Sequence, residues 1–372
     1  MKLNIERAAF LKALGHIQSV VERRTTIPIL SNLMLRAEPG RLTLGATDMD
    51  VEIVEGLPGH IAREGRTTAP AHTLYDIVRK LREGSQIEIE VSGERNAMVL
   101  RSGRSTFTLA CLPAEDYPLM ASGELPYNFS LSAAELRSLI DRTRFAISTE
   151  ETRYYLNGIY LHTTKADEVP VMRAVATDGH RLARVEMVLP EGAAGMPGVI
   201  IPRKAVLELR KLVEETESEV QIGLSETKLR VAIGEAALTS KLIDGTFPDY
   251  DRVIPSNNDK VLEVECKTFA EAVDRVSTIS TEKSRAVKLT VESGSLVVSA
   301  TSPENGSAVE ELEVRYSASP LEIGFNSRYL LDIAEQIEGD GMQFVMSDAG
   351  SPTVVRDSAD ASALYVLMPM RV

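Results

Sequence analysis

The sequence has little of several features that mark specialised classes of protein. Its 372 residues contain no tryptophan and only two cysteines, Cys111 and Cys266. Two isolated cysteines cannot build a disulfide framework or a cysteine zinc site, and we interpret both as small core residues. No apolar run approaches the ~20 residues that span a bilayer, and the first residues lack the apolar segment of a signal peptide. We therefore expect a cytoplasmic protein that has no membrane partner.

The motifs of the common catalytic classes are missing too. The sequence has no Gly-Lys dipeptide, hence no phosphate-binding P-loop, and it has no HExxH, GxSxG or GxGxxG motif. Lys and Arg total 41 against 54 Asp and Glu, and the resulting charge of −13 argues against holding nucleic acid by bulk charge alone. We predict no catalytic residue, no metal site and no cofactor.

The strongest catalytic candidate is a set of three acids, Asp48, Asp50 and Glu52. On a strand these residues share one face, where a two-metal nuclease could use them. Because the same pattern is typical of a half-exposed strand, we favour a solvated strand face, and a metal-dependent nuclease is the alternative function. His180 beside Asp178 could form an acid–base pair, but the Asp-Gly dipeptide there is a hairpin-turn signal and no nucleophile accompanies it.

A threefold repeat organises the chain. Its first marker is a strand pattern followed by an amphipathic helix, which begins at residues 3, 129 and 262 with identical offsets. A second helix begins near residues 70, 202 and 326, and an alternating strand follows each one. Between the two helices the third marker reads ATD, ATD and ATS. The period of about 125 to 130 residues is far longer than that of a solenoid.

These markers predict an α+β fold of three repeated domains, each with two helices covering one face of an antiparallel sheet. The domains are expected at 1–126, 127–258 and 259–372, with boundaries in SGELPYN and IPSNNDK. The expected helices span 7–21, 72–83, 134–145, 203–215, 267–279 and 326–338. Ser132 and Glu135 fit a capping box. The six expected helices together carry a net charge of +3, and the remaining residues carry −16. A charged helix face is, however, most often only a solvated face.

Seven motifs carry a resemblance to a known family. They are LRSGRS (100–105), RYYLNG (153–158), ATDGHRLA (176–183), IPRK (201–204), SKLIDGTFPDY (240–250), GFNSRYLLD (324–332) and YVLMPMR (365–371). In order along the whole chain they resemble motifs of the bacterial sliding clamps, the beta subunits of the DNA polymerase III holoenzyme.

The resemblance implies a head-to-tail homodimeric ring of six domains, with helices lining a hole that holds duplex DNA. It implies a processivity factor without chemistry of its own. An ATP-driven clamp loader would load it, and it would tether the replicative polymerase catalytic subunit, other polymerases and repair factors. Domains about 35 Å across leave a hole of about 35 Å when six form a ring, but about 5 Å when three do, and duplex DNA is about 20 Å wide. A protein-interaction scaffold that never meets DNA is a further alternative.

The family's DNA contacts, carried over by resemblance, fall on Arg24, His72, Glu150, Tyr154 and Tyr155. His72 stands where the family has arginine and Glu150 where it has glutamine, and Glu150 would repel phosphate. From the residues alone, the two tyrosines beside an arginine suit phosphates and bases, but packing on a strand is equally open.

The family's partner-peptide site also carries over, with apolar walls and a few cations that suit an extended motif. Its residues are Leu156, Thr177, Gly179, His180, Arg181, Leu182, Pro248, Arg252, Val253, Asn326, Tyr329, Val366, Met368, Pro369, Met370 and Arg371.

The resemblance further implies a dimer interface in which opposite charges surround an apolar centre. It pairs an edge of the first domain with an edge of the third, here Arg104, Phe107 and Leu109 against Ile279, Glu304, Glu310 and Glu311. Thr106, Gly306 and Ser307 replace charged residues of the family pattern, so we expect a less salt-dependent interface.

Overall fold

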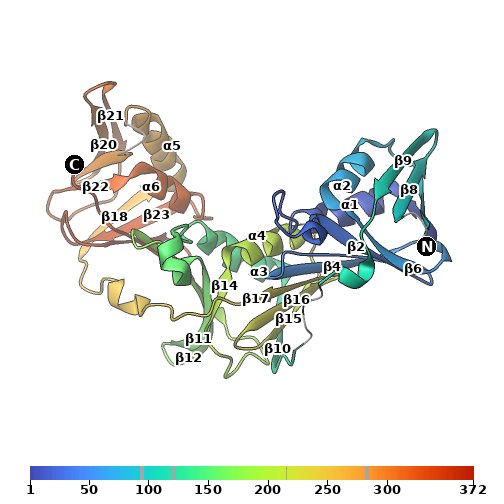
Figure 1. Ribbon diagram of the computed structural model, residues 1–372. Helices are drawn as coiled ribbons and strands as arrows, with labels where there is room; N and C mark the ends of the chain where they lie inside the picture. The colour runs from blue at the N-terminus through green and yellow to red at the C-terminus, as the bar shows by residue number, and fades with distance from the viewer. Residues whose placement is uncertain (93–95, 119, 121–122, 215, 281–284) are drawn as a thin grey trace. The chain divides into compact units, whose positions relative to one another are not determined.

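The computed structural model describes residues 1–92, 96–118, 120, 123–214, 216–280 and 285–372. Within them one order of elements occurs three times: a strand, a helix, four strands, a second helix and three strands (Figure 1). The first copy has one additional short strand, β5. This order confirms the predicted α+β fold of three repeated domains. The predicted boundary stretch SGELPYN begins at residue 122, which lies outside the described residues.

The elements of the first copy are β1 (Lys2–Glu6), α1 (Arg7–Gln18), β2 (Asn32–Glu38), β3 (Arg41–Thr47), β4 (Val51–Pro58), β5 (His60–Arg63), β6 (Gly65–Pro70), α2 (Ala71–Lys80), β7 (Gln86–Ser92), β8 (Ala97–Ser102) and β9 (Ser105–Ala110). Those of the second are β10 (Tyr127–Ser132), α3 (Ala133–Arg144), β11 (Gly158–Ala166), β12 (Val169–Thr177), β13 (Arg181–Val188), β14 (Val199–Pro202), α4 (Arg203–Leu212), β15 (Glu219–Leu224), β16 (Lys228–Ile233) and β17 (Ala236–Lys241). Those of the third are β18 (Lys260–Glu265), α5 (Cys266–Ser277), β19 (Ala286–Glu292), β20 (Ser295–Ser302), β21 (Gly306–Glu313), β22 (Leu321–Asn326), α6 (Ser327–Ala334), β23 (Gly341–Met346), β24 (Thr353–Asp357) and β25 (Ala363–Leu367).

The chain forms two compact units. Unit 1 contains Met1–Arg137 and Pro190–Ile243, and unit 2 contains Ser138–Leu189 and Asp244–Val372. Unit 1 holds the sheets β10-β15-β16-β17-β4-β3-β2-β6 and β5-β1-β7-β8-β9. In unit 2, seven strands pair in the order β11-β12-β13-β25-β24-β23-β18 and four in the order β21-β20-β19-β22. The antiparallel pairs β4–β17 and β13–β25 therefore join strands of consecutive copies in one sheet.

The helices bury one apolar face each, as the sequence periodicity predicts. In unit 1, α1 packs against α2 and over β3 and β4, and its Phe10, Leu14 and Ile17 are fully buried. In unit 2, α5 packs against α6, and Phe269 meets Phe344 of β23 edge to face at 5.3 Å (Figure 1). Burial of apolar side chains on one stripe of each helix is the main source of its stability.

The helix starts agree with the predicted ones to within a residue, but the helices end one to four residues early. After α1, the amides of Val20 and Val21 donate to carbonyls three residues back, so the last turn tightens and leaves the α-helical pattern. The end predicted for α4, residue 215, lies outside the described residues. Ser132 and Glu135 form the predicted capping box, with the Glu135 amide 3.1 Å from the Ser132 hydroxyl. No helix of the described residues is long and apolar enough to cross a membrane.

Candidate functional sites

A tight hairpin turn, residues 178–180, joins β12 to β13 in unit 2. One oxygen of Asp178 accepts hydrogen bonds from the amides of His180, at 2.9 Å, and Arg181, at 3.0 Å. Gly179 has φ of +88°, a conformation that side chains with a Cβ rarely adopt. The hairpin predicted from Asp-Gly is thus confirmed. It leaves Gly179 and His180 exposed at its tip.

Arg181, the first residue of β13, follows this turn, and its side chain is only 9% exposed. Its guanidinium bonds Asp178 at 3.1 Å, the Phe145 carbonyl at 2.6 Å and the carboxylate of Asp332 on α6. It also lies 4.2 Å from the ring centroid of Tyr329. Because all its nitrogens are engaged, Arg181 joins the hairpin to α6 and is not a free cation that orients a peptide.

The C-terminal tail, Met368–Val372, is hydrogen bonded to the hairpin and to β22. The Met368 amide donates to the His180 carbonyl at 2.9 Å, and the Met370 amide donates to the Gly324 carbonyl of β22 at 2.8 Å. Before the tail, Val366 of β25 pairs with Leu182 of β13, and both are buried. Met368 is 42% exposed, so the tail presents an apolar side chain next to the hairpin tip.

Another part of the predicted peptide site, Pro248 to Val253, is held by an aromatic cluster in unit 2 that includes Phe247 and Tyr250. Phe247 stacks on Tyr160 of β11 at 4.8 Å, and Tyr160 stacks on His162 at 4.7 Å. His162 in turn meets the Tyr250 hydroxyl at 2.8 Å. Burial, with Arg173 nearby, lowers the pKa of His162. The cluster fixes the segment that carries Pro248, Arg252 and Val253 on the sheet, and these three side chains are exposed.

The sixteen predicted peptide-site residues all belong to unit 2. Hydrogen bonds, strand pairing or a ring contact bring together eight of them: Thr177, Gly179, His180, Arg181, Leu182, Tyr329, Val366 and Met368. Asn326 caps α6 by accepting from the Arg328 amide at 3.0 Å. The sequence did not single out Asp332, Tyr160 or Gly324, whose contacts hold the site together. GFNSRYLLD contains two of them, but the spacing alone does not reveal their long-range contacts.

The predicted DNA contacts divide between the units. In unit 1, Arg24 is exposed after α1, whereas both ring nitrogens of His72 are hydrogen bonded, to the Gln18 side chain at 2.8 Å and the Val21 carbonyl at 2.9 Å. His72 therefore bridges α2 and the C-terminal end of α1, and both its ring nitrogens are engaged within unit 1.

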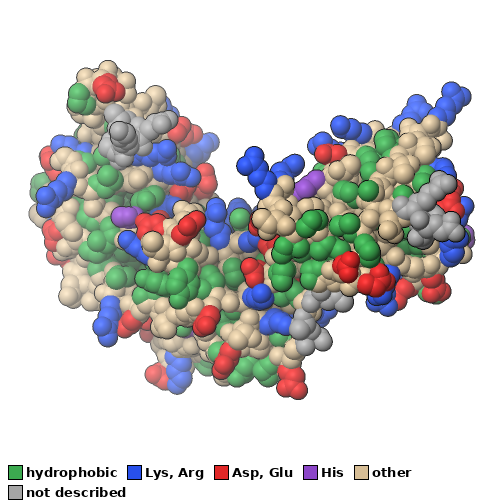
Figure 2. Space-filling view, in the orientation of Figure 1, with side chains coloured by type: hydrophobic (Ala, Val, Ile, Leu, Met, Phe, Trp, Pro, Cys, Tyr) green, Lys and Arg blue, Asp and Glu red, His purple; other side chains and the backbone are tan. Residues whose placement is uncertain are grey.

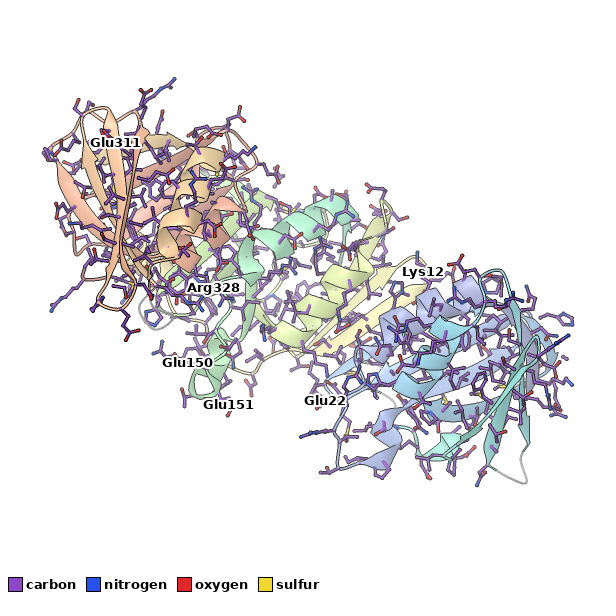
Figure 3. The ribbon with its side chains drawn as sticks, turned by 90° about the horizontal axis from the view of Figure 1, so that it is seen from above. Lys12, Glu22, Glu150, Glu151, Glu311 and Arg328 are labelled. Atoms are coloured by element: carbon purple, nitrogen blue, oxygen red, sulfur yellow. The ribbon has the colours of Figure 1, made fainter. Side chains whose placement is uncertain are left out.

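In unit 2, Tyr154 and Tyr155 lie in a short 3₁₀ helix, Glu151–Leu156, and not on a strand. Tyr154 is 53% exposed and meets Tyr155 edge to face. The Glu150 carboxylate is 3.1 Å from Arg153, which offsets part of its repulsion of phosphate. Figure 3 shows Glu150 and Glu151 projecting from the ribbon at this helix.

The predicted dimer residues lie at two sheet edges. Phe107 and Leu109 are half-buried on β9, the last strand of its sheet, and Arg104 precedes it. Glu310 and Glu311 lie on β21, also a last strand, where Figure 3 labels Glu311. Glu310 is already bound by Arg275 through contacts of 2.6 and 3.0 Å, so its charge is largely compensated within the chain. Ile279 lies two residues after the end of α5, and Glu304 lies in the turn between β20 and β21.

The three acids of the nuclease alternative do not form a strand face, and our interpretation of them as a solvated strand face is wrong. Asp48 and Asp50 lie in the turn between β3 and β4, where Met49 has φ of +79°. Asp48 is paired with Lys204 of α4, and Asp50 with Lys241 at 3.0 Å. Among the described residues no three His, Cys, Asp or Glu side chains are grouped so that they could hold a metal ion.

Family models cover nearly all of the chain. They are those of the DNA polymerase III beta subunit: the N-terminal domain matches residues 1–121, the central domain 130–249 and the C-terminal domain 251–371.

Curated relatives and solved structures agree over the full length. The beta sliding clamps of Caulobacter vibrioides and Escherichia coli K12 are 56% and 39% identical over 372 residues, which are 100% of either chain. The crystal structure of a sliding clamp from Bartonella birtlesii bound to griselimycin is 54% identical, with a TM-score of 0.97 and 100% of both chains covered. That of the Caulobacter crescentus clamp is 56% identical, also at 0.97, covering 100% of this chain and 99% of the other. The chain therefore belongs to the DNA polymerase III beta subunit family, the bacterial sliding clamps, and is a non-catalytic processivity factor of a DNA polymerase.

Proposed function

We propose that two copies of this chain close head to tail into a ring around duplex DNA. The observation that carries the proposal is the repeated use of one strand pair. Strand β4 of the first copy pairs with β17 of the second, and β13 of the second pairs with β25 of the third. By order in the repeat, β4, β13 and β21 are equivalent, and so are β9, β17 and β25.

Of these six strands, β21 and β9 are the two that take no part in the pairs β4–β17 and β13–β25. Each is the last strand of its sheet in the described residues and pairs on one side only. Because unpaired strand edges favour pairing with another chain, β21 of one copy and β9 of another supply the third junction of the same type. Two such junctions close a ring of six domains, proposed at 1–126, 127–258 and 259–372 of each chain.

Apolar and charged side chains on these two strands suit the junction. Val309 on β21 is 68% exposed, and Phe107 and Leu109 offer apolar surface on β9. Arg104 then faces Glu304 and Glu311 across the junction, with Ile279 and the Arg275-bound Glu310 beside them. The expected test result is a particle of about 81 kDa in light scattering, twice the 40.7 kDa of one chain. A monomer at micromolar concentration would contradict the ring.

Ring closure explains how a chain with a net charge of −13 can function on DNA. Retention depends on topology, so weak phosphate contacts suffice and permit sliding. Figure 2 shows basic and acidic side chains interspersed on the face in view, without one broad basic field. We assign the DNA contacts to Arg24, Tyr154 and Tyr155, with His72 and Glu150 as weaker positions.

We assign partner binding to the hairpin tip, the C-terminal tail and the Pro248–Val253 segment of unit 2. Exposed Met368, Val253 and Pro248 offer apolar contacts, and exposed His180 and Arg252 offer polar ones. Such a surface suits a short extended motif with large apolar side chains. The clamp loader, the replicative polymerase, other polymerases and repair factors would use it in turn in the cytoplasm.

Deleting residues 368–372 tests this assignment. The deletion removes the exposed apolar side chain of Met368, and we expect it to weaken binding of the purified polymerase catalytic subunit by roughly 30-fold or more, the loss typical of a buried anchor. The dimer mass should stay unchanged, since β9 and β21 are untouched. Normal polymerase binding by the truncated dimer would place the site elsewhere.

A further inference from the structure

The C-terminal tail is docked on β22 through one antiparallel bridge. Strand β22 pairs with β19 on one side and is the last strand of its four-stranded sheet. On its other side, the Met370 amide bonds the Gly324 carbonyl at 2.8 Å in an antiparallel bridge. Two residues earlier, the Met368 amide bonds the hairpin carbonyl of His180 at 2.9 Å. The tail backbone is thus anchored at Met368 and at Met370, on either side of Pro369.

Gly324 is required by the close approach of the tail. A Cβ atom at this position would lie 2.6 Å from the Met370 carbonyl oxygen and 2.8 Å from one methyl of Val372, and closer still to the other methyl. Real Cβ atoms do not approach heavy atoms to less than 3.0 Å, and the Met370 oxygen belongs to the backbone and cannot rotate away. The φ angle of Gly324 lies outside the left-handed region, so the requirement is steric and not conformational.

We propose that docking of the tail on Gly324 positions Met368 to Met370 for partner binding, and so sets the affinity of the peptide site. The inference rests on the proposed function of that surface. Gly324 itself would not contact the partner, because it acts through the tail. A tail released from β22 would keep its apolar side chains, but it would have to be ordered again at the moment of binding, which costs affinity.

The experiment compares Gly324→Ala with Gly45→Ala in the full-length dimer. Both glycines lie within strands, but a Cβ at Gly45 would have its nearest neighbour at 3.6 Å, an ordinary contact. Surface plasmon resonance with the purified polymerase catalytic subunit gives the affinity, and thermal unfolding and light scattering report on fold and dimer. We expect Gly324→Ala to weaken binding about tenfold or more, with dimer mass retained, and Gly45→Ala to bind as wild type.

A second comparison places Gly324→Ala in the protein that lacks residues 368–372. Without the tail the three nearest neighbours of the new methyl group are gone, so the substitution should change the residual affinity by less than about twofold. Should Gly324→Ala not fold, Val372 alone is deleted. This deletion removes the side chain that lies against Gly324 and leaves the Met370 bridge, and we expect severalfold weaker binding. Wild-type affinity in Gly324→Ala, or in the Val372 deletion when the former is unfolded, overturns the docking proposal. If the tail deletion also binds normally, the proposed peptide site itself fails.

Discussion

Replacing Asp48 by alanine should destabilise unit 1, although Asp48 lies in a turn. One oxygen of its carboxylate accepts hydrogen bonds from the amides of Asp50 at 2.9 Å and Val51 at 2.7 Å, and the other is paired with Lys204. Burial alone would raise the pKa of Asp48, but Lys204 and the two amides together hold it below its usual value. The side chain is only 13% exposed, so water replaces these partners poorly.

The size of the effect follows from the bonds that are lost. Hydrogen bonds to a charged group contribute about 1.5–3 kcal/mol each, and Lys204 keeps its contacts with the Val20 carbonyl and Glu22. The Asp50 amide is exposed and can bond water in the variant, so the net loss is smaller than the sum of three bonds. We expect about 3 kcal/mol, or roughly 6–12 °C in the unfolding temperature of a unit of this size. The contribution is present above pH 3.8, the ordinary pKa of Asp, and is lost as the pH falls through the lower folded value.

Asp50→Ala is the matched control for this prediction. Its ion pair with Lys241 is exposed, at 73% for the Asp50 side chain, so the change should cost less than about 1 kcal/mol. Thermal unfolding followed by circular dichroism separates the two variants. Equal unfolding temperatures for Asp48→Ala and wild type would refute the structural role of Asp48. DNA cleavage by purified wild type that disappears in the stable Asp50→Ala variant would favour the nuclease alternative.

Arg104→Glu should weaken the dimer at least tenfold by placing like charges opposite Glu304 and Glu311, and sedimentation equilibrium would expose a wrong interface if the dissociation constant stayed the same. Polymerase affinity should fall as the pH drops below 6.5, because protonating His162, which burial and nearby Arg173 disfavour, opposes the folded 244–253 segment. His162→Phe, which keeps the stacking, should flatten that pH profile, and an unchanged profile would exclude His162 as its cause.

Local patterns predicted the repeat, the six helices and the hairpin, because each depends on residues close in sequence. Periodicity located α1 and α5, and Asp-Gly located the turn at residues 178–180. The same reasoning failed for Asp48, whose environment is decided by Lys204, 156 residues away. The helix ends were also missed, since tightening of the last turn depends on the packing around it.

The candidate sites were predictable as motifs but not as geometry. The family resemblance named Arg181 and Tyr329, yet it could not show that Arg181 is enclosed by Asp178, Asp332 and the Phe145 carbonyl. Nor could it show that Glu310 is compensated by Arg275 on α5. Both are contacts between elements far apart in the chain, and each changes the role that a charged residue can have.

Retention on circular DNA tests the central claim most directly. The protein is loaded by its clamp loader onto nicked circular DNA, separated from free protein by gel filtration, and the DNA is then cut once. A closed ring of two chains should stay with the circle and leave within minutes of linearisation, since only topology retains a protein of charge −13. Equal retention before and after the cut, or no retention on the circle, would contradict encirclement.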